Sequence, residues 1–116
     1  MTDDNCLFCK IASGKIPAAV VHRDDDVVAF KDIKPAAPLH LLVVPTRHLS
    51  GLGDAQLQDA GLLGKLMLVG ANLAKEAGFA ESGFRVVMNT GPDAGQSVHH
   101  AHLHVLAGRP LAWPPG

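Results

Sequence analysis

Three histidines occupy alternate positions near the C-terminus, at His100, His102 and His104. Alternate residues of a β-strand point to the same face of a sheet. The pattern therefore predicts a strand over residues 98–106 that presents three imidazoles in one row, while the apolar residues between them face a core. Because imidazole is the side chain best suited to proton transfer, nucleophilic attack and metal binding near neutral pH, this row is the first candidate for a functional site.

The other apolar segments predict an α+β domain, with several antiparallel strands and one main helix. Short β-rich runs cover residues 20–22, 27–30, 39–44 and 84–88. A run of three aspartates between the first two is typical of a hairpin turn. A short helix is expected over residues 6–13, ending at Gly14.

A long helix is expected from an N-cap at Asp54 to about Ala77, with Gly78 as its C-cap. Apolar residues recur at helical spacing on its core-facing side: Leu63, Leu66, Met67, Leu73, Ala74 and Ala77. Glycine weakens a helix by about 1 kcal/mol per residue. The glycines within it are either tolerated or mark the close approach of another backbone, and we favour the second interpretation for Gly61, Gly64 and Gly70.

Length and composition exclude several classes of function. The 116 residues, 47% of them hydrophobic, predict one domain over residues 1–116. A net charge of −1 gives no basic field for nucleic acid, and no apolar stretch reaches the roughly 18–20 residues that span a bilayer.

The acidic first five residues are unlike a signal peptide. Both cysteines lie in one Cys6-x-x-Cys9 unit, which is typical of a metal or redox motif. We expect a cytoplasmic protein without nucleic-acid or membrane partners.

Residues near the histidine row add the elements of a nucleotide pocket. Ser97 follows the glycine-rich run 91–96, whose backbone N–H groups can bind an anion such as phosphate. His40 is a conspicuous imidazole on a separate apolar strand. Asp32 can accept two sugar hydroxyls, while its apolar neighbours Phe30 and Ile33 hold a flat base.

The run His100-Ala-His102-Leu-His104-Val-Leu resembles the signature of the histidine-triad (HIT) family, in which three histidines alternate with apolar residues. Further segments resemble the family over nearly the whole chain: the opening Cys6-Leu-Phe-Cys, Phe30-Lys-Asp-Ile, His40-Leu-Leu-Val-Val-Pro, Asn89-Thr-Gly, Ala94-Gly-Gln-Ser-Val and the ending Trp113-Pro-Pro-Gly. The ending is similar to that of the Hint branch, the purine nucleoside phosphoramidases. The resemblance implies a five-stranded antiparallel sheet with one long and one short helix, continued across a homodimer, in which the Trp113 tail approaches the partner's site.

The resemblance also implies roles for these residues. His102 is the nucleophile that attacks the α-phosphorus of an adenosine phosphoramidate or of a related aminoacyl or lysyl adenylate. Water then hydrolyses the nucleotidyl-histidine to AMP. His104 holds the phosphate with residues 95–97, Ser97 bonds the departing nitrogen, and His40 serves the proton network. The implied nucleotide contacts are Phe30, Asp32, Ile33, Asn89, Gly95, Gln96, Ser97, Val98, His102 and His104. No cofactor is required for this chemistry.

Some bacterial HIT proteins carry the same cysteine pair and complete a zinc site with two histidines, which match His48 and His100 here. His99 is the rival ligand, and a pair of reduced buried thiols without metal is the alternative. Two other functions also remain open: a dinucleoside polyphosphate hydrolase of a sister branch, and a nucleotide-binding scaffold whose hydrolysis is incidental.

Overall fold

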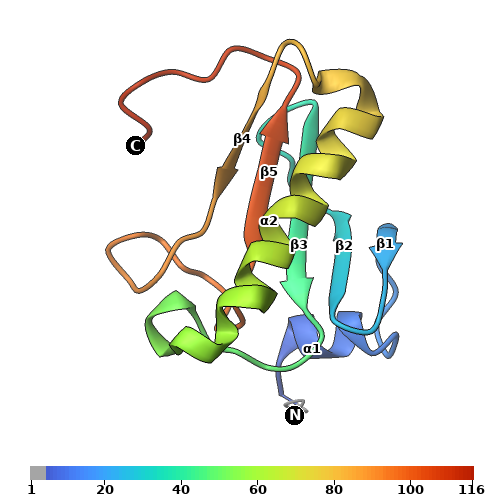
Figure 1. Cartoon of the computed structure of the whole chain (residues 1–116), viewed down its shortest axis with the longest axis vertical. Coiled ribbons are helices and arrows are strands. Elements are labelled where there is room, and N and C mark those ends of the chain that lie inside the picture. The colour runs from blue at the N-terminus through green and yellow to red at the C-terminus, as the bar shows by residue number, and fades with distance from the viewer. Residues whose placement is uncertain (1–4) are drawn as a thin grey trace.

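A five-stranded antiparallel sheet with the order β1-β2-β3-β5-β4 organises the chain (Figure 1). The strands are β1 (Val20–Arg23), β2 (Val27–Lys31), β3 (Leu39–Pro45), β4 (Phe84–Val87) and β5 (Leu103–Ala107). The computed structural model describes residues 5–116, so residues 1–4, on which the argument against a signal peptide rests, lie outside the described part. The α+β fold with five antiparallel strands is confirmed.

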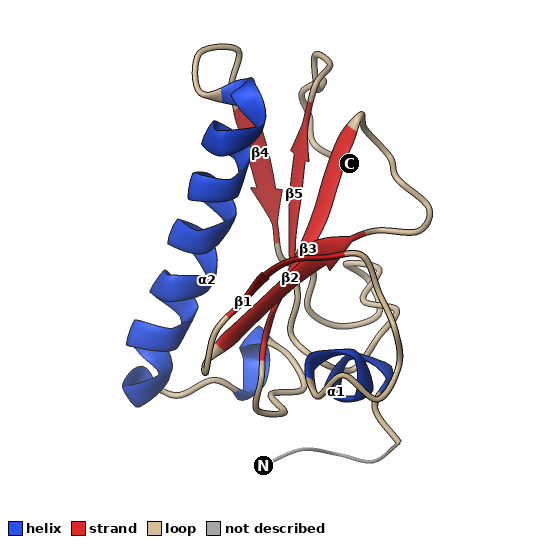
Figure 2. Cartoon of the chain, turned by 90° about the vertical axis from the view of Figure 1, so that its right-hand side faces the viewer, coloured by secondary structure: helices blue, strands red, loops and turns tan. Residues whose placement is uncertain are grey.

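The two α-helices, α1 (Leu7–Ala12) and α2 (Ala60–Ala74), pack on opposite faces of the sheet (Figure 2). The longer helix α2 lies along one face, and α1 covers one end of the other. Strands β2 and β3 are covered on both faces, which explains why their sequences are continuous apolar runs rather than alternating ones. Strand β5 alternates between buried and half-buried residues.

Helix α2 contacts the sheet through fewer residues than its sequence suggests. Leu66 and Ala74 are fully buried, whereas Met67 is 51% exposed and Ala77 is also exposed, so the prediction that these two face the core is wrong. The helical hydrogen-bonding pattern becomes irregular after Ala74, in the π-helical turn η3 (Lys75–Phe79). Gly78 lies within this turn at φ +99°, a conformation that disfavours other residues, and stops the helix.

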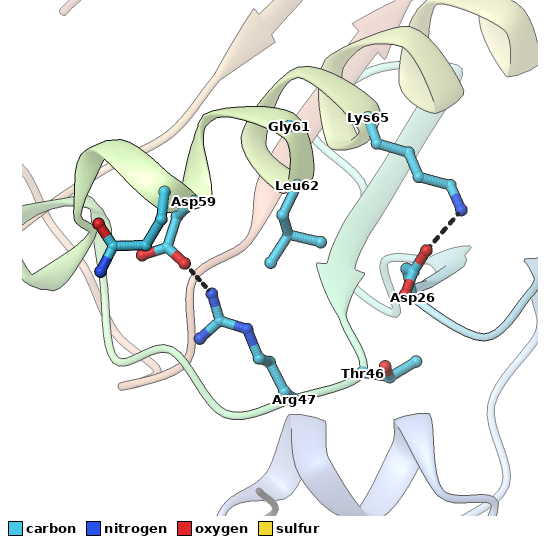
Figure 3. A pocket seen from close by; sticks show the side chains of 8 residues that line it. Asp26, Thr46, Arg47, Asp59, Gly61, Leu62 and Lys65 are labelled. Atoms are coloured by element: carbon cyan, nitrogen blue, oxygen red, sulfur yellow. Dashed lines mark hydrogen bonds and ion pairs between the residues drawn. The ribbon is translucent and has the colours of Figure 1, made fainter.

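The start of α2 also differs from the prediction. Two 3₁₀ turns, η1 (Leu52–Asp54) and η2 (Leu57–Asp59), precede the helix, and Asp54 is not its N-cap. The Asp54 carboxylate instead accepts a hydrogen bond from Ser50. A capping box between Gln56 and Asp59 starts the helical segment, and Arg47 pairs with Asp59 beside it (Figure 3).

The C-terminal segment extends past β4, and Trp113 is 80% exposed in the single chain (Figure 1). The Arg85 guanidinium on β4 donates to the carbonyl oxygens of Leu111 and Ala112 and so attaches this segment to the sheet edge. The last residues form no regular structure. Within residues 5–116, none of the helices has the length and apolar character needed to cross a bilayer.

Candidate active site

The histidine row faces the α1 side of the sheet, although the strand that carries it is shorter than predicted. Strand β5 begins at Leu103, so only His104 of the three histidines is part of it. The alternation nevertheless holds across the strand start, because Leu103 and Val105 enter the core beneath α2 while His100 and His102 are buried on the other side. The predicted common face of the three imidazoles is therefore present.

A cavity of about 520 Å³ lies on this side of the sheet. His102 and His104 line it together with Asp32 and Ser97. Lys31 is the one other charged residue of its wall. The rest of the wall is apolar and comes mainly from α1, the segment after it and the sheet: Leu7, Phe8, Ile11, Ile16, Pro17, Ala18, Ala19, Phe30, Ile33, Leu42 and Val98. A mainly apolar cavity with a few polar groups at one wall is typical of a small-molecule site.

The His102 imidazole is fixed by the backbone of its own chain. Its Nδ1 lies 2.7 Å from the carbonyl oxygen of His100. A carbonyl oxygen can only accept, so Nδ1 carries the proton and Nε2 keeps its lone pair. The ring of Phe8 packs edge-on against His102 with 5.1 Å between ring centroids. The ring of His102 is thus oriented so that, in its neutral form, Nε2 is its nucleophilic nitrogen.

His40 and His104 form a relay whose direction is also set by the backbone. The amide of Ala36 donates to His40 Nδ1 at 2.9 Å, so the proton of neutral His40 sits on Nε2. His40 Nε2 lies 2.8 Å from His104 Nδ1 and donates to it. Neutral His104 therefore carries its own proton on Nε2, where it can donate to a ligand in the cavity.

Burial keeps both rings of this pair neutral. Desolvation lowers the pKa of His104 to about 4, and the neighbouring His102 and His40 act in the same direction. Desolvation also lowers the pKa of His40, against the attraction of the Asp32 carboxylate. The relay consequently holds its hydrogen-bond direction at neutral pH.

Asp32 has places left for a ligand. One carboxylate oxygen accepts from the Lys34 amide at 2.9 Å, and the other lies 3.4 Å from His40 Nε2. Asp32, His40 and His104 lie close enough to suggest a metal site. The Ala36 amide argues against it, because it leaves His40 Nε2 protonated and unable to ligate a metal.

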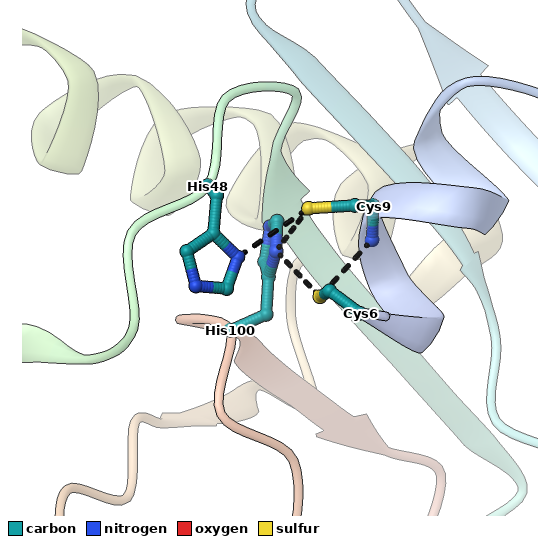
Figure 4. Close-up of side chains that lie close together, drawn as sticks. All are labelled: Cys6, Cys9, His48 and His100. Atoms are coloured by element: carbon teal, nitrogen blue, oxygen red, sulfur yellow. Dashed lines mark hydrogen bonds between the residues drawn. The ribbon is translucent and has the colours of Figure 1, made fainter. Parts of the chain in front are cut away.

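A second cluster includes the first histidine of the row and joins Cys6, Cys9, His48 and His100 (Figure 4). His100 is fully buried and its Nε2 donates to the Pro45 carbonyl at 2.9 Å, so Nδ1 offers a lone pair. That nitrogen lies 3.3 Å from both cysteine sulfurs, and His48 Nδ1 lies 3.4 Å from Cys9 Sγ. The neighbouring His99 is not one of the four.

The donor set of this cluster fits zinc. Tetrahedral zinc with ordinary Zn–S and Zn–N bonds separates sulfur from nitrogen by about 3.5 Å, close to the distances observed here. One lone pair on His100 Nδ1 cannot fully accept protons from two thiols, whereas one cation satisfies all four donors. The Cys9 amide donates to Cys6 Sγ at 3.3 Å and the Pro45 carbonyl orients His100, and both are typical outer-shell contacts of a metal site.

Three residues expected at the nucleotide do not line the cavity: Asn89, Gly95 and Gln96. The Gln96 side chain is occupied with the backbone, since it donates to the Ser50 and Val98 carbonyls and accepts from the Gly91 amide. It thus holds the glycine-rich turn in place. His22 does not line the cavity, is half-buried and lies 2.6 Å from the Asp24 carboxylate.

The contribution of α1 to the cavity was missed in the sequence. Phe8 and Ile11 are separated by one helical turn and are buried, which gives even this short helix an apolar side. That spacing was a usable signal, but only the tertiary fold shows which surface it covers. Phe8 also contacts Phe30, with 5.5 Å between ring centroids, and so links the helix to the cavity floor.

A second cavity, of about 430 Å³, lies at the start of α2 (Figure 3). It is lined largely by polar residues and contains no histidine. Its cations are already paired, Arg47 with Asp59 and Lys65 with Asp24 and Asp26. Its charged groups hold α2 against the sheet and leave the histidine-lined cavity as the candidate active site.

The fold and the site together define a small α+β domain in which an alternating histidine row forms one wall of an apolar cavity. A family profile described as "Scavenger mRNA decapping enzyme C-term binding" matches residues 5–110. An uncharacterised HIT-like protein of Synechococcus elongatus is 46% identical, with 100% of both chains covered. Adenylylsulfatase HINT1 of Arabidopsis thaliana is 44% identical over 99% of this chain and 79% of its own.

The solved structures agree with this match. The crystal structure of a HIT family hydrolase from Legionella pneumophila superimposes with a TM-score of 0.95 and 47% identity, covering 97% of this chain and 100% of that one. The chain belongs to the histidine-triad family, as its motifs predicted.

Proposed function

We propose that the protein is a nucleotide hydrolase that cleaves the P–N bond of purine nucleoside phosphoramidates. The observation that carries this proposal is the 2.7 Å contact between His102 Nδ1 and the His100 carbonyl, which makes Nε2 the nitrogen that carries the lone pair in the neutral ring. Nε2 attacks the α-phosphorus, and the P–N bond breaks as the amine leaves with a proton. Water then attacks the phosphorus of the nucleotidyl-histidine, releasing AMP and restoring His102.

The cavity suggests a place for each part of the nucleotide. The apolar wall around Phe30 and Ile33 accommodates the flat base, and the free carboxylate positions of Asp32 accept the ribose hydroxyls. His104 Nε2–H and Ser97 lie on the same cavity as His102 and stabilise the phosphate oxygens and the departing amine. Gln96 supports this site by holding the glycine-rich turn through its bonds to the Ser50 and Val98 carbonyls and the Gly91 amide.

A second candidate substrate is adenylyl sulfate. The Arabidopsis relative is named an adenylylsulfatase, and the same attack on an adenylyl phosphorus would release sulfate instead of an amine. The chemistry at His102 is identical for both, and only the leaving group differs. Dinucleoside polyphosphate hydrolysis and AMP binding without turnover are the remaining alternatives.

The proposal is tested by turnover of adenosine 5′-phosphoramidate, adenylyl sulfate and diadenosine polyphosphates by the wild type and His102→Ala. We expect the phosphoramidate to be the preferred substrate. His102→Ala should lower its turnover by at least about 1,000-fold, as loss of a covalent nucleophile does, while AMP binding measured by calorimetry remains.

His22→Ala is the matched control, because it removes an imidazole that pairs with Asp24 outside the cavity. It should retain full activity. A wild type that binds AMP but hydrolyses none of these compounds would establish the scaffold function instead. Preference for another of the three substrates would replace the phosphoramidase assignment while keeping the nucleophile.

We further propose that Cys6, Cys9, His48 and His100 hold a structural zinc ion, whose role is to join α1 to the sheet rather than to enter the reaction. We also propose that the chain forms a homodimer in which the exposed Trp113 tail reaches the partner's site. Cys6 and Cys9 form no disulfide with each other, which favours a reducing compartment, the cytoplasm.

A further inference from the structure

The turn that follows β5 packs against the segment that connects β2 to β3. Gly108, immediately after the strand, adopts φ +98°, and a Cβ atom there would lie 2.7 Å from Cβ of Pro38. Position 108 therefore requires glycine, because other residues rarely adopt this backbone conformation and because a side chain there would clash with Pro38. This contact brings the next residue, Arg109, alongside Ala36.

Arg109 binds one backbone carbonyl with two nitrogens. Its Nε and one terminal nitrogen donate to the Ala36 oxygen at 3.1 and 2.9 Å, and its other terminal nitrogen donates to the Pro110 carbonyl at 3.1 Å. Arg109 does not line the candidate active site, and neither does Ala36. The guanidinium thus holds a loop rather than a ligand.

The same residue, Ala36, provides the amide that fixes His40. Its N–H donates to His40 Nδ1 at 2.9 Å, His40 Nε2 contacts His104 Nδ1 at 2.8 Å, and His104 lines the cavity. Among the described residues, the charged group that faces His40 is the Asp32 carboxylate, which lies 3.4 Å from His40 Nε2. The Ala36 amide is the hydrogen bond that occupies Nδ1, and the Asp32 carboxylate, an acceptor near Nε2, favours the same tautomer.

We propose that Arg109 is a positioning residue for the phosphoramidase reaction: it holds Ala36 so that the Ala36 amide keeps His40 in the Nε2-protonated tautomer that orients His104. The inference rests on the proposed function. Without the guanidinium, the connecting segment is freer to move, and His40 Nδ1 competes with Nε2 for the single proton. His104 then loses its donor at Nδ1 in part of the molecules and presents the wrong nitrogen to the phosphate.

The test compares Arg109→Ala, Arg109→Lys and Arg85→Ala. Arg85 is the matched control, because its guanidinium also donates to two backbone carbonyls but does so at Leu111 and Ala112, away from His40. Two quantities are measured: kcat and KM with adenosine 5′-phosphoramidate, and the tautomer of His40 from the ¹⁵N chemical shifts of its imidazole. Thermal unfolding confirms that each variant is folded.

We expect Arg109→Ala to lower kcat by about 5- to 20-fold, the effect of losing one ordered hydrogen bond, with KM changed by less than about twofold. The His40 ¹⁵N shifts should move from a single Nε2-protonated form toward a mixture. Arg109→Lys should recover part of both quantities, since its ammonium can donate to the Ala36 carbonyl once. Arg85→Ala should leave the His40 tautomer unchanged, because its guanidinium donates to the Leu111 and Ala112 carbonyls and not to that of Ala36.

An unchanged kcat or an unchanged His40 tautomer in Arg109→Ala, or the same change of tautomer in Arg85→Ala, would each overturn the proposal. If the wild type hydrolysed no phosphoramidate, the proposed function would fail independently. The ¹⁵N measurement would still decide whether Arg109 sets the tautomer of His40.

Discussion

At the scale of single residues, backbone groups decide what each imidazole can do. The Pro45 carbonyl sets the tautomer of His100, the His100 carbonyl sets that of His102, and an amide sets that of His40. Carbonyls and amides do not titrate, so each of these contacts selects the same tautomer wherever its imidazole is neutral. Similar side chains thereby acquire different roles, with Nδ1 free in His100 and Nε2 free in His102.

The depressed pKa of His104 predicts a specific dependence of stability on pH. A histidine in the unfolded chain titrates near pH 6.5, whereas folded His104 titrates near pH 4. Between these values the unfolded state binds the extra proton, so stability is complete above about pH 6.5 and is lost as the pH falls toward 4. The slope from this one group is about 1.4 kcal/mol per pH unit.

The measurement is urea unfolding of the wild type and His104→Gln at several pH values between 4 and 7. Glutamine removes the titrating group but keeps a hydrogen-bonding side chain. The wild type should lose more stability than His104→Gln on acidification, and NMR should show His104 neutral at pH 5. Parallel stability curves for the two proteins would show that His104 is not held neutral by the fold.

At the scale of elements, the alternation of residues 98–106 predicted which way the side chains point but not where the strand begins. The ladder between β3 and β5 reaches only the pair Val43 and Leu103. Two residues further along β3, Pro45 has no N–H to donate and its carbonyl is bound by the His100 side chain. That termination depends on a tertiary contact, which local sequence does not contain.

The helix start illustrates a different limit. Asp54 is an acceptable N-cap, and the sequence does not show that its carboxylate is bound elsewhere. Ser50 donates to that carboxylate, and the helical segment begins instead at Gln56, whose side chain accepts from the Asp59 amide while the Asp59 carboxylate accepts from the Gln56 amide. The presence of the helix can thus be predicted from the sequence, but its first residue depends on side-chain contacts that the sequence does not show.

Helix α2 also carries glycines of two kinds, which should respond oppositely to substitution. A Cβ at Gly70 would lie 2.9 Å from Cγ2 of the fully buried Val105, whereas nothing lies within 4 Å of one at Gly64. Gly64→Ala should therefore stabilise the protein by roughly 0.5–1 kcal/mol through helix propensity. Gly70→Ala should destabilise it by roughly 1 kcal/mol, because overpacking exceeds that gain.

Denaturant unfolding of both variants measures these free energies, and each serves as the control for the other. Equal stabilisation by the two substitutions would mean that α2 can move away from β5 without cost.

The sequence led us to expect the close approach of another backbone at Gly61, Gly64 and Gly70. The structure shows a close approach at Gly70 alone, and the approaching atoms belong to side chains of the sheet.

At the scale of the whole molecule, the sheet separates a large core under α2 from a smaller one under α1. Helix α1 has six residues, which is too short to be stable alone. The Cys6 and Cys9 thiols join it to His48 in the loop after β3 and to His100 before β5. Since α1 also supplies Phe8 to the cavity wall, this cluster connects stability to ligand binding.

Loss of the proposed zinc should therefore affect both properties. We expect one zinc ion per wild-type chain by elemental analysis, little in Cys6→Ser, and a Tm lowered by roughly 5–10 °C in that variant or after chelation. AMP should bind more weakly to the zinc-free protein, because α1, which forms part of the cavity wall, is then held less firmly. His99→Ala is the matched control, because His99 neighbours the cluster but is not part of it, and it should keep its zinc. Equal zinc in the wild type and Cys6→Ser would remove the metal site, and the small core would then have to hold α1 by packing alone.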